Sequence, residues 1–172
     1  MERREEYLIT QRKENLVYHK LLMNIAMSNR VVLDLGTTLI LNVSPDYSSI
    51  ISQKLSHALS QKGEIIDVLN IEVPYPDETD LEYYEDKLNE TLHYLHNEKY
   101  TNFIFVEAAI IRGSNYKWIK DKFSCYNKNN LLFCALFENK NSLFKSDCVG
   151  EYYNNDTQDL TFYWERYNKH WE

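Results

Sequence analysis

The sequence predicts an α/β fold in which a mainly parallel sheet is flanked by helices. Two observations carry this prediction. Short apolar runs alternate with segments whose apolar residues recur at helical spacing, and this alternation is typical of parallel strands joined by helices. The chain of 172 residues also has no internal repeat, low-complexity tract or Gly/Ser-rich linker. We therefore expect residues 1–172 to form a single domain around one core.

Each predicted element follows from its local pattern. Helices are expected where apolar residues recur three or four positions apart, as in the stripe Ile50, Ile51, Leu55, Ala58 and Leu59. Strands are expected where short apolar runs end at Gly, Pro or polar residues. In chain order the predicted elements are a helix at 12–28, strands at 31–35 and 38–43, a helix at 44–63, a strand at 65–73, a helix at 77–97, a strand at 103–106, a helix at 115–123, a strand at 131–137, and strands near 148–152 and 160–164.

Composition narrows the class of partner. The net charge of -7 argues against broad nucleic-acid binding, which needs a basic surface. No apolar run approaches the length that spans a bilayer, so no membrane association is expected. The three cysteines are odd in number and widely spaced, which fits buried thiols in a reducing, cytoplasmic setting and no metal site. Tyrosine occurs 14 times and suits stacking or an interface, and we expect a homodimer or higher oligomer.

The strongest chemical signal is the segment from Phe103 to Tyr116. A buried strand runs into Glu107, and after a short turn Arg112-Gly113-Ser114-Asn115 opens a helix. Glycine permits close approach of the backbone to a ligand, and successive amides at a helix N-terminus attract phosphate. The sequence therefore predicts a phosphate-binding loop at 107–116. The alternative is an ordinary strand-to-helix turn that uses Gly113 for its geometry.

This segment resembles the ribose-phosphate-binding motif of the type I phosphoribosyltransferases. That motif has four apolar residues, an acidic pair, a few mixed residues, and a Gly-containing, hydroxyl-rich turn. Here Glu107 matches the first acidic position, and Ala108 stands at the second. The resemblance implies that Glu107 holds the ribose hydroxyls as the catalytic residue. It also implies a set of residues around the ribose 5'-phosphate, namely Ile111, Arg112, Gly113, Ser114 and Asn115.

The C-terminal region resembles that of the 6-oxopurine phosphoribosyltransferases, particularly the xanthine–guanine type. There an aromatic residue shortly before a Trp-acid ending covers the purine ring. By position, Phe162, Tyr163 or Trp164 is expected to stack on a base. The alternative is that these aromatic side chains belong to the core or to a dimer contact. The resemblance further implies a small hood, made from terminal segments, beside the sheet.

Two regions depart from the family pattern. The segment that should bind pyrophosphate, at 44–49, has no Gly, Lys or Arg, and the segment at 74–86 is acidic. Two hypotheses remain open. One is a protein that binds PRPP, with Mg²⁺, or a purine nucleotide, and transfers 5-phosphoribosyl to a purine-type base. The other is a catalytically inactive protein of the same fold that senses a nucleotide or serves as a protein-interaction or regulatory module.

Overall fold

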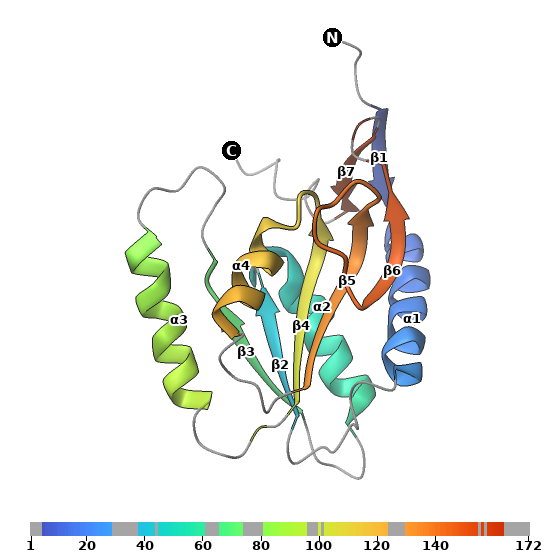
Figure 1. The fold of residues 1–172 in the computed structure, drawn as a ribbon. Helices are drawn as coiled ribbons and strands as arrows, with labels where there is room; N and C mark the ends of the chain where they lie inside the picture. Colours follow the sequence, from blue (N-terminus) through green and yellow to red (C-terminus); the bar gives the residue numbers. More distant parts are fainter. Residues whose placement is uncertain are drawn as a thin grey trace, which may run out of the picture.

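The computed structural model describes residues 5–28, 38–43, 45–60, 66–73, 81–95, 100, 102–123, 130–154, 156 and 158–163. Within this part of the chain, five parallel strands form one sheet in the order β3-β2-β4-β5-β6, and helices flank it (Figure 1). The predicted α/β fold is confirmed. The elements are β1 (Glu5–Ile9), α1 (Gln11–Met27), β2 (Thr38–Val43), α2 (Pro45–Leu59), β3 (Asp67–Ile71), α3 (Leu81–Leu95), β4 (Asn102–Ile110), α4 (Ser114–Phe123), β5 (Asn130–Asn139), β6 (Cys148–Tyr153) and β7 (Gln158–Phe162).

The two faces of the sheet carry separate apolar clusters, because side chains alternate along each strand. Ile40 and Ile104 lie in the cluster that includes the buried side chains of α1 and α2. Leu41 and Phe105 lie in the other cluster, with buried residues of α3 and α4. Figure 1 shows the same division, with α4 in front of the central strands and α2 behind them. The sheet is therefore covered on both faces, as its continuous apolar strands require.

Helix α2 turns a different set of side chains toward the sheet than the sequence predicts. Ile51, Leu55 and Leu59 are buried on α2, but Ile50 and Ala58 are exposed. Their expected places are taken by three buried serines that recur every four residues, Ser48, Ser52 and Ser56. Each serine hydroxyl donates a hydrogen bond inward, to Val43 O, Asn42 Oδ1 and Ile66 O respectively. Small side chains with satisfied hydroxyls let α2 approach the sheet closely.

A two-stranded parallel sheet forms the predicted hood. It pairs β1 with β7, which lie next to each other although they come from opposite ends of the chain (Figure 1). Ile9 and Phe162 are buried in the cluster beneath α1, and Tyr7 donates a hydrogen bond to Glu151 of β6 at 3.2 Å. Strand β1 was not predicted. Its sequence Glu-Glu-Tyr-Leu-Ile begins with two charged residues, and its only described strand partner lies about 150 residues away.

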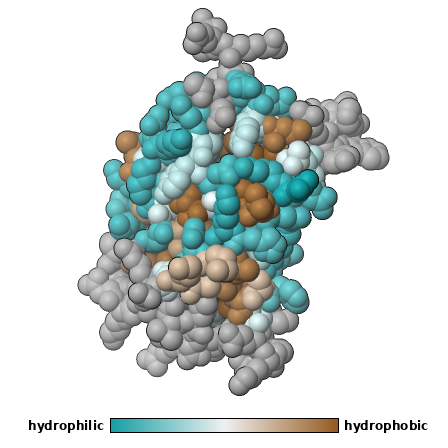
Figure 2. All heavy atoms as spheres, turned by 90° about the vertical axis from the view of Figure 1, so that its right-hand side faces the viewer, coloured by the Kyte–Doolittle hydropathy of each residue, from teal (hydrophilic) through white to brown (hydrophobic). Residues whose placement is uncertain are grey.

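Helix α1 covers the β6 edge of the large sheet. Asn24 donates its side-chain amide to Val149 O at 2.9 Å, and a Cβ at Gly150 would stand 2.6 Å from Val17 Cγ1. The hydrogen bond and the close packing at Gly150 hold the helix against the strand and cover an otherwise open edge. Figure 2 shows this side of the molecule, where hydrophilic residues predominate and apolar areas are separated. The outward side chains of Leu16, Met23 and Met27 on α1 are more than half exposed.

Other boundaries differ modestly from those predicted. Strand β4 extends to Ile110, four residues beyond the predicted end, so Glu107 lies within a strand rather than in a loop. The predicted strand at 31–35 and the predicted end of a helix at Gly63 lie outside the described residues. Cys134 and Cys148 are buried thiols at paired positions of neighbouring strands, and neither is in a disulfide. Among the described residues, we find no helix with the length and hydropathy needed to cross a bilayer.

Candidate functional site

The predicted phosphate loop lies between β4 and α4, at the carboxyl end of a central strand. Only residues 111–113 separate Ile110 from Ser114, the first residue of α4. Gly113 has a φ of 79°, in the left-handed region where a side chain is unfavourable. Its carbonyl accepts a hydrogen bond from Lys117 N at 3.1 Å, which closes the first turn of the helix. Ligands of parallel sheets bind at this edge.

Gly113 is required by packing as well as by its backbone angle. A Cβ at this position would stand 2.6 Å from Ser142 Oγ and 2.7 Å from Phe144 Cβ. The ring of Phe144 also contacts the ring of Tyr116, with centroids 5.5 Å apart. The turn that joins β5 to β6 therefore occupies one side of the loop. The structural explanation for this glycine is compatible with ligand binding, because Arg112 and Ser114 on either side of it are exposed.

The other side of the loop is open. Arg112 and Ser114 are exposed, and Asn115 is half-buried. The first amides of an α-helix have no partner inside the helix, and they point along its axis toward the region beyond its N-terminus. Arg112 forms no ion pair with another residue in the described part of the chain, and Lys117 is exposed in the first turns of α4, whereas Lys120 lies in its last turn. Amides and cations together make this end of α4 suitable for an anion.

Glu107 lies directly beside this loop. The residue is only 8% exposed, and its carboxylate accepts a hydrogen bond from Asn115 Nδ2 at 3.4 Å. Burial, followed by the charge of Glu107, raises the pKa of Tyr116 well above its usual value. Burial, with Glu107 next and Asp159 after it, raises the pKa of Tyr153 to about 12. The structure therefore brings Glu107 and Asn115 together at the end of β4, and it surrounds the carboxylate with tyrosines that keep their protons.

Ala108, at the second acidic position of the motif, belongs to the core. It is 1% exposed, and its backbone N–H donates to Ser48 Oγ at 3.2 Å. That hydroxyl in turn donates to Val43 O at 2.5 Å. The two bonds join β4, α2 and the end of β2. The methyl group of Ala108 is buried in the core, so the site has one acidic residue where the motif has two.

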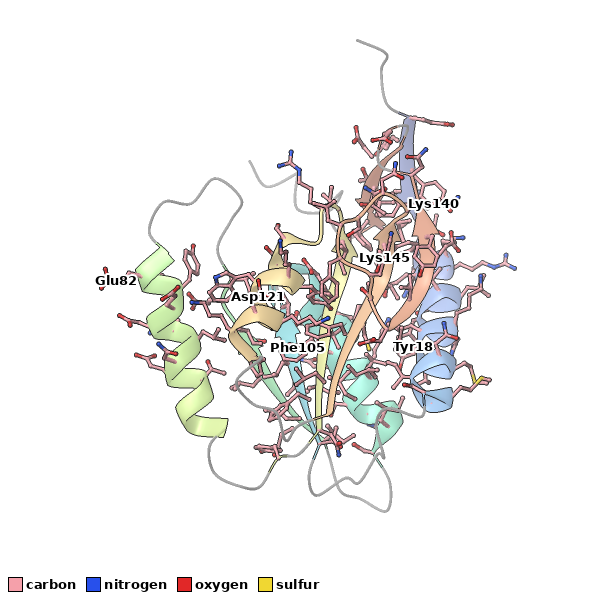
Figure 3. All side chains as sticks on the ribbon, in the orientation of Figure 1. Tyr18, Glu82, Phe105, Asp121, Lys140 and Lys145 are labelled. Atoms are coloured by element: carbon pink, nitrogen blue, oxygen red, sulfur yellow. The ribbon has the colours of Figure 1, made fainter. Side chains whose placement is uncertain are left out.

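The segment expected to bind pyrophosphate is mostly helix. Strand β2 ends at Val43 and α2 begins at Pro45, so a single residue connects them. Ser48 is fully buried and bonded within the fold. Of the acidic segment at 74–86, residues 74–80 lie outside the described residues. Glu82 and Asp86 are exposed on α3, and Figure 3 shows Glu82 at the end of that helix.

The predicted base-binding residues divide into three cases. Phe162 is 3% exposed and packs edge-on against Phe137, with ring centroids 5.8 Å apart. Its ring is part of the core, so the alternative packing role describes it better than base stacking does. Tyr163 follows β7 and is half-buried, which leaves part of its ring accessible. Trp164 lies outside the described residues. Base binding by Tyr163 or Trp164 stays a prediction.

The described residues do not supply a metal site beside Glu107. They contain no group of three His, Cys, Asp or Glu side chains that could hold an ion. Ala108 contributes only a methyl group, and the Glu107 carboxylate is buried against Asn115. The described side chains around Glu107 therefore do not fit Mg²⁺ as a protein-held cofactor.

The overall fold is that of purine phosphoribosyltransferases of known structure. Xanthine-guanine-hypoxanthine phosphoribosyltransferase from Helicobacter pylori superposes with a TM-score of 0.67 at 11% identity, covering 98% of each chain. A hypothetical protein from Neisseria gonorrhoeae with bound ppGpp gives a TM-score of 0.66 at 11% identity, covering 98% of this chain and 97% of the other.

A third similar structure is hypoxanthine phosphoribosyltransferase from Trypanosoma cruzi in complex with the product IMP. Its TM-score is 0.56 at 10% identity, with 90% of this chain and 80% of that chain covered. No protein-family model matches the sequence, and no curated protein matches it. At such low identities the likeness defines the fold and leaves the activity to be argued from the site.

Proposed function

We propose that the protein binds a purine nucleotide and holds its 5'-phosphate at the N-terminus of α4. The observation that carries this proposal is the open loop at 111–113, where the exposed Arg112 and Ser114 flank the first amides of the helix. An anion at a helix N-terminus is stabilised by those amides and by the helix dipole. Glu107 lies beside the loop, where its carboxylate can accept hydrogen bonds from ribose hydroxyls.

The similar structures support the class of ligand. The Trypanosoma cruzi enzyme is described in complex with IMP, and the Neisseria gonorrhoeae protein with bound ppGpp. Both ligands are purine nucleotides with a phosphorylated ribose. The half-buried Tyr163 at the hood supports a purine as the base, because a tyrosine ring can stack on any base at about 1–3 kcal/mol.

The β2–α2 connection, at the same edge of the sheet, favours binding without turnover. A polyanion needs several donors or cations. A single residue connects β2 to α2. Ser48, in the first turn of α2, is already bonded within the fold. A nucleotide with one phosphate on its ribose needs only the α4 site. A sensor or regulatory module is therefore the form of the proposal that these residues support best.

Phosphoribosyl transfer from PRPP is the second candidate. It is favoured by Glu107, which keeps the first acidic position of the motif at the end of β4. Transfer of this kind depends on positioning and on stabilising charge, without a covalent nucleophile. Mg²⁺ would enter with the pyrophosphate of PRPP rather than on side chains of this protein.

The test is calorimetric titration of the purified protein with GMP, with ribose 5-phosphate, and with PRPP in the presence and absence of Mg²⁺. We expect saturable binding of GMP that is lost in Ser114→Asp. Ser114 is exposed at the first helical position, where an aspartate favours the helix dipole but repels a phosphate. The matched control Ser114→Ala removes the hydroxyl without adding charge, and it should retain most of the affinity.

The outcomes separate the candidates. Binding of GMP without release of pyrophosphate from PRPP and guanine supports a sensor. Release of pyrophosphate in that assay supports transfer. Failure of all three ligands to bind at millimolar concentration would contradict the proposed function and leave a fold used for protein interaction.

A further inference from the structure

The turn between β5 and β6 lies against the proposed phosphate loop along its whole length. We call residues 139–146 the strap. Asn139 Nδ2 donates to Ile111 O at 3.0 Å, and Leu143 N donates to Arg112 O at 3.1 Å. The third loop residue, Gly113, packs against Ser142 and Phe144 so closely that a Cβ has no room. All three residues of the loop are therefore held by the strap.

Asn139 is the central residue of these contacts. Its side chain is 6% exposed, and its Oδ1 accepts a hydrogen bond from Asn141 N at 3.2 Å. Its backbone carbonyl accepts from Ser142 N at 2.9 Å. One buried amide thus shapes the turn of the strap through its oxygen and holds the loop carbonyl through its nitrogen. A buried donor and acceptor that are both satisfied fix the geometry of the groups around them.

The strap is itself fixed at both ends. Near its end, Ser146 N donates to the fully buried Glu138 carboxylate at 2.9 Å, and Lys145 Nζ lies 3.6 Å from the other oxygen. Near its start, Lys140 N donates to Tyr153 O at 2.8 Å. Figure 3 labels Lys140 and Lys145 on this turn, beside β5 and β6. A loop held by a fixed strap has little freedom to rotate its amides away.

The strap also reaches the hood. Asn141 Nδ2 donates to Asp156 Oδ2 at 2.7 Å, and Asp156 lies two residues before β7. This bond is exposed, so it contributes little energy. It provides a matched control, because it belongs to the same strap but does not contact the loop at 111–113.

From these contacts we propose that Asn139 is a positioning residue of the nucleotide site, which holds Ile111 so that the amides at the start of α4 face the phosphate. The inference rests on the proposed function and deepens it. Asn139 does not contact the ligand. Its effect is confined to the phosphate part of the ligand, because the loop at 111–113 is the part of the site that it holds.

The test compares the affinities for GMP and guanosine, so that their ratio measures the contribution of the phosphate alone. Asn139→Leu is close to asparagine in size and is uncharged, but it loses the donor to Ile111 O. We expect Asn139→Leu and Asn139→Ala to lower the GMP-to-guanosine affinity ratio about tenfold, the effect of one good hydrogen bond. Asn141→Ala should leave the ratio within about twofold of the wild type, because it removes only an exposed bond.

The outcomes of this comparison are distinguishable. If the wild-type protein prefers GMP and the Asn139 variants keep the same GMP-to-guanosine affinity ratio, the positioning role is overturned and the proposed function stands. Wild-type protein that binds GMP no better than guanosine would overturn both. Thermal unfolding of each variant identifies a change of fold, and Asn139→Leu carries the test if Asn139→Ala does not fold.

Discussion

Two βα connections at the same edge of the sheet have opposite characters. Between β2 and α2 a single residue makes the connection, and Ser48 is buried with its hydroxyl bonded to Val43 O. Between β4 and α4 three residues make the connection, Gly113 has a φ of 79°, and Arg112 and Ser114 are exposed. The described hydroxyl nearest the first connection is bonded within the fold, whereas the second connection has exposed polar side chains.

The difference shows how one fold can keep half of a ligand site. A ligand group needs donors that the protein has not already used. In the first turns of α2, the hydroxyl of Ser48 is already bonded to Val43 O and Ala108 N. The β4–α4 connection is held from behind by the strap, which contacts loop carbonyls and leaves the helix amides available. The following predictions test this contrast.

The largest effect is expected for Gly113→Val. The substitution places a β-branched residue at a φ of 79° and a Cβ 2.6 Å from Ser142 Oγ. Strain and overpacking together should lower the free energy of unfolding by about 3 kcal/mol. Urea denaturation followed by circular dichroism measures this change. Stability close to that of the wild type would mean that the loop is not held against the strap.

The next effect is expected for Ser48→Ala. The change leaves the buried Ala108 N–H and Val43 O without their hydroxyl partner, which should cost about 2 kcal/mol of stability. The affinity for GMP should not change, because this connection is not part of the proposed site. The same denaturation measurement, with a GMP titration beside it, checks both statements. A loss of affinity with unchanged stability would reverse the roles assigned to the two connections.

An alkaline transition is expected from the tyrosines around Glu107. Burial raises the pKa of Tyr153 to about 12 in the folded protein, above about 10 in the unfolded chain. Its contribution to stability is therefore fully present below pH ~10 and is lost as the pH rises through ~12. Tyr153→Phe should reduce this alkaline loss relative to the wild type. Parallel pH profiles of the two proteins would contradict the assignment.

The smallest effect is expected for Ser114→Asp on stability. Ser114 is exposed and begins α4, whose first turn has no acidic residue. An aspartate there should change the free energy of unfolding by about 0.5 kcal/mol or less, in the stabilising direction. A large loss of stability would mean that any loss of GMP binding in this variant reports unfolding rather than repulsion of a phosphate.

Much of the fold could be predicted from local patterns. The alternation of apolar runs and helical stripes located β2, β4, β5 and their helices to within a few residues. These local patterns did not predict the features that depend on long-range contacts. Strand β1 depends on β7 at the other end of the chain, and Ile50 is exposed because three serines face the sheet in its place.

The candidate site could be predicted only in part, for the same reason. Gly113 and its exposed neighbours form a recognisable pattern because a strand, a glycine turn and a helix start are adjacent in the sequence. The roles of Asn139 and Ser48 depend on partners 28 and 60 residues away. No local signal marks them, although the run Asn139-Lys140-Asn141-Ser142 has the composition of a tight turn.

The measurement that tests the central claim most directly is a titration of ¹⁵N-labelled protein with GMP, followed by amide chemical shifts. We predict that the largest shifts occur at Gly113, Ser114 and Asn115, while Ser48 and the rest of the β2–α2 connection change little. Shifts that concentrate at the start of α2, or that leave the amides of the β4–α4 connection unchanged at saturation, would contradict the account.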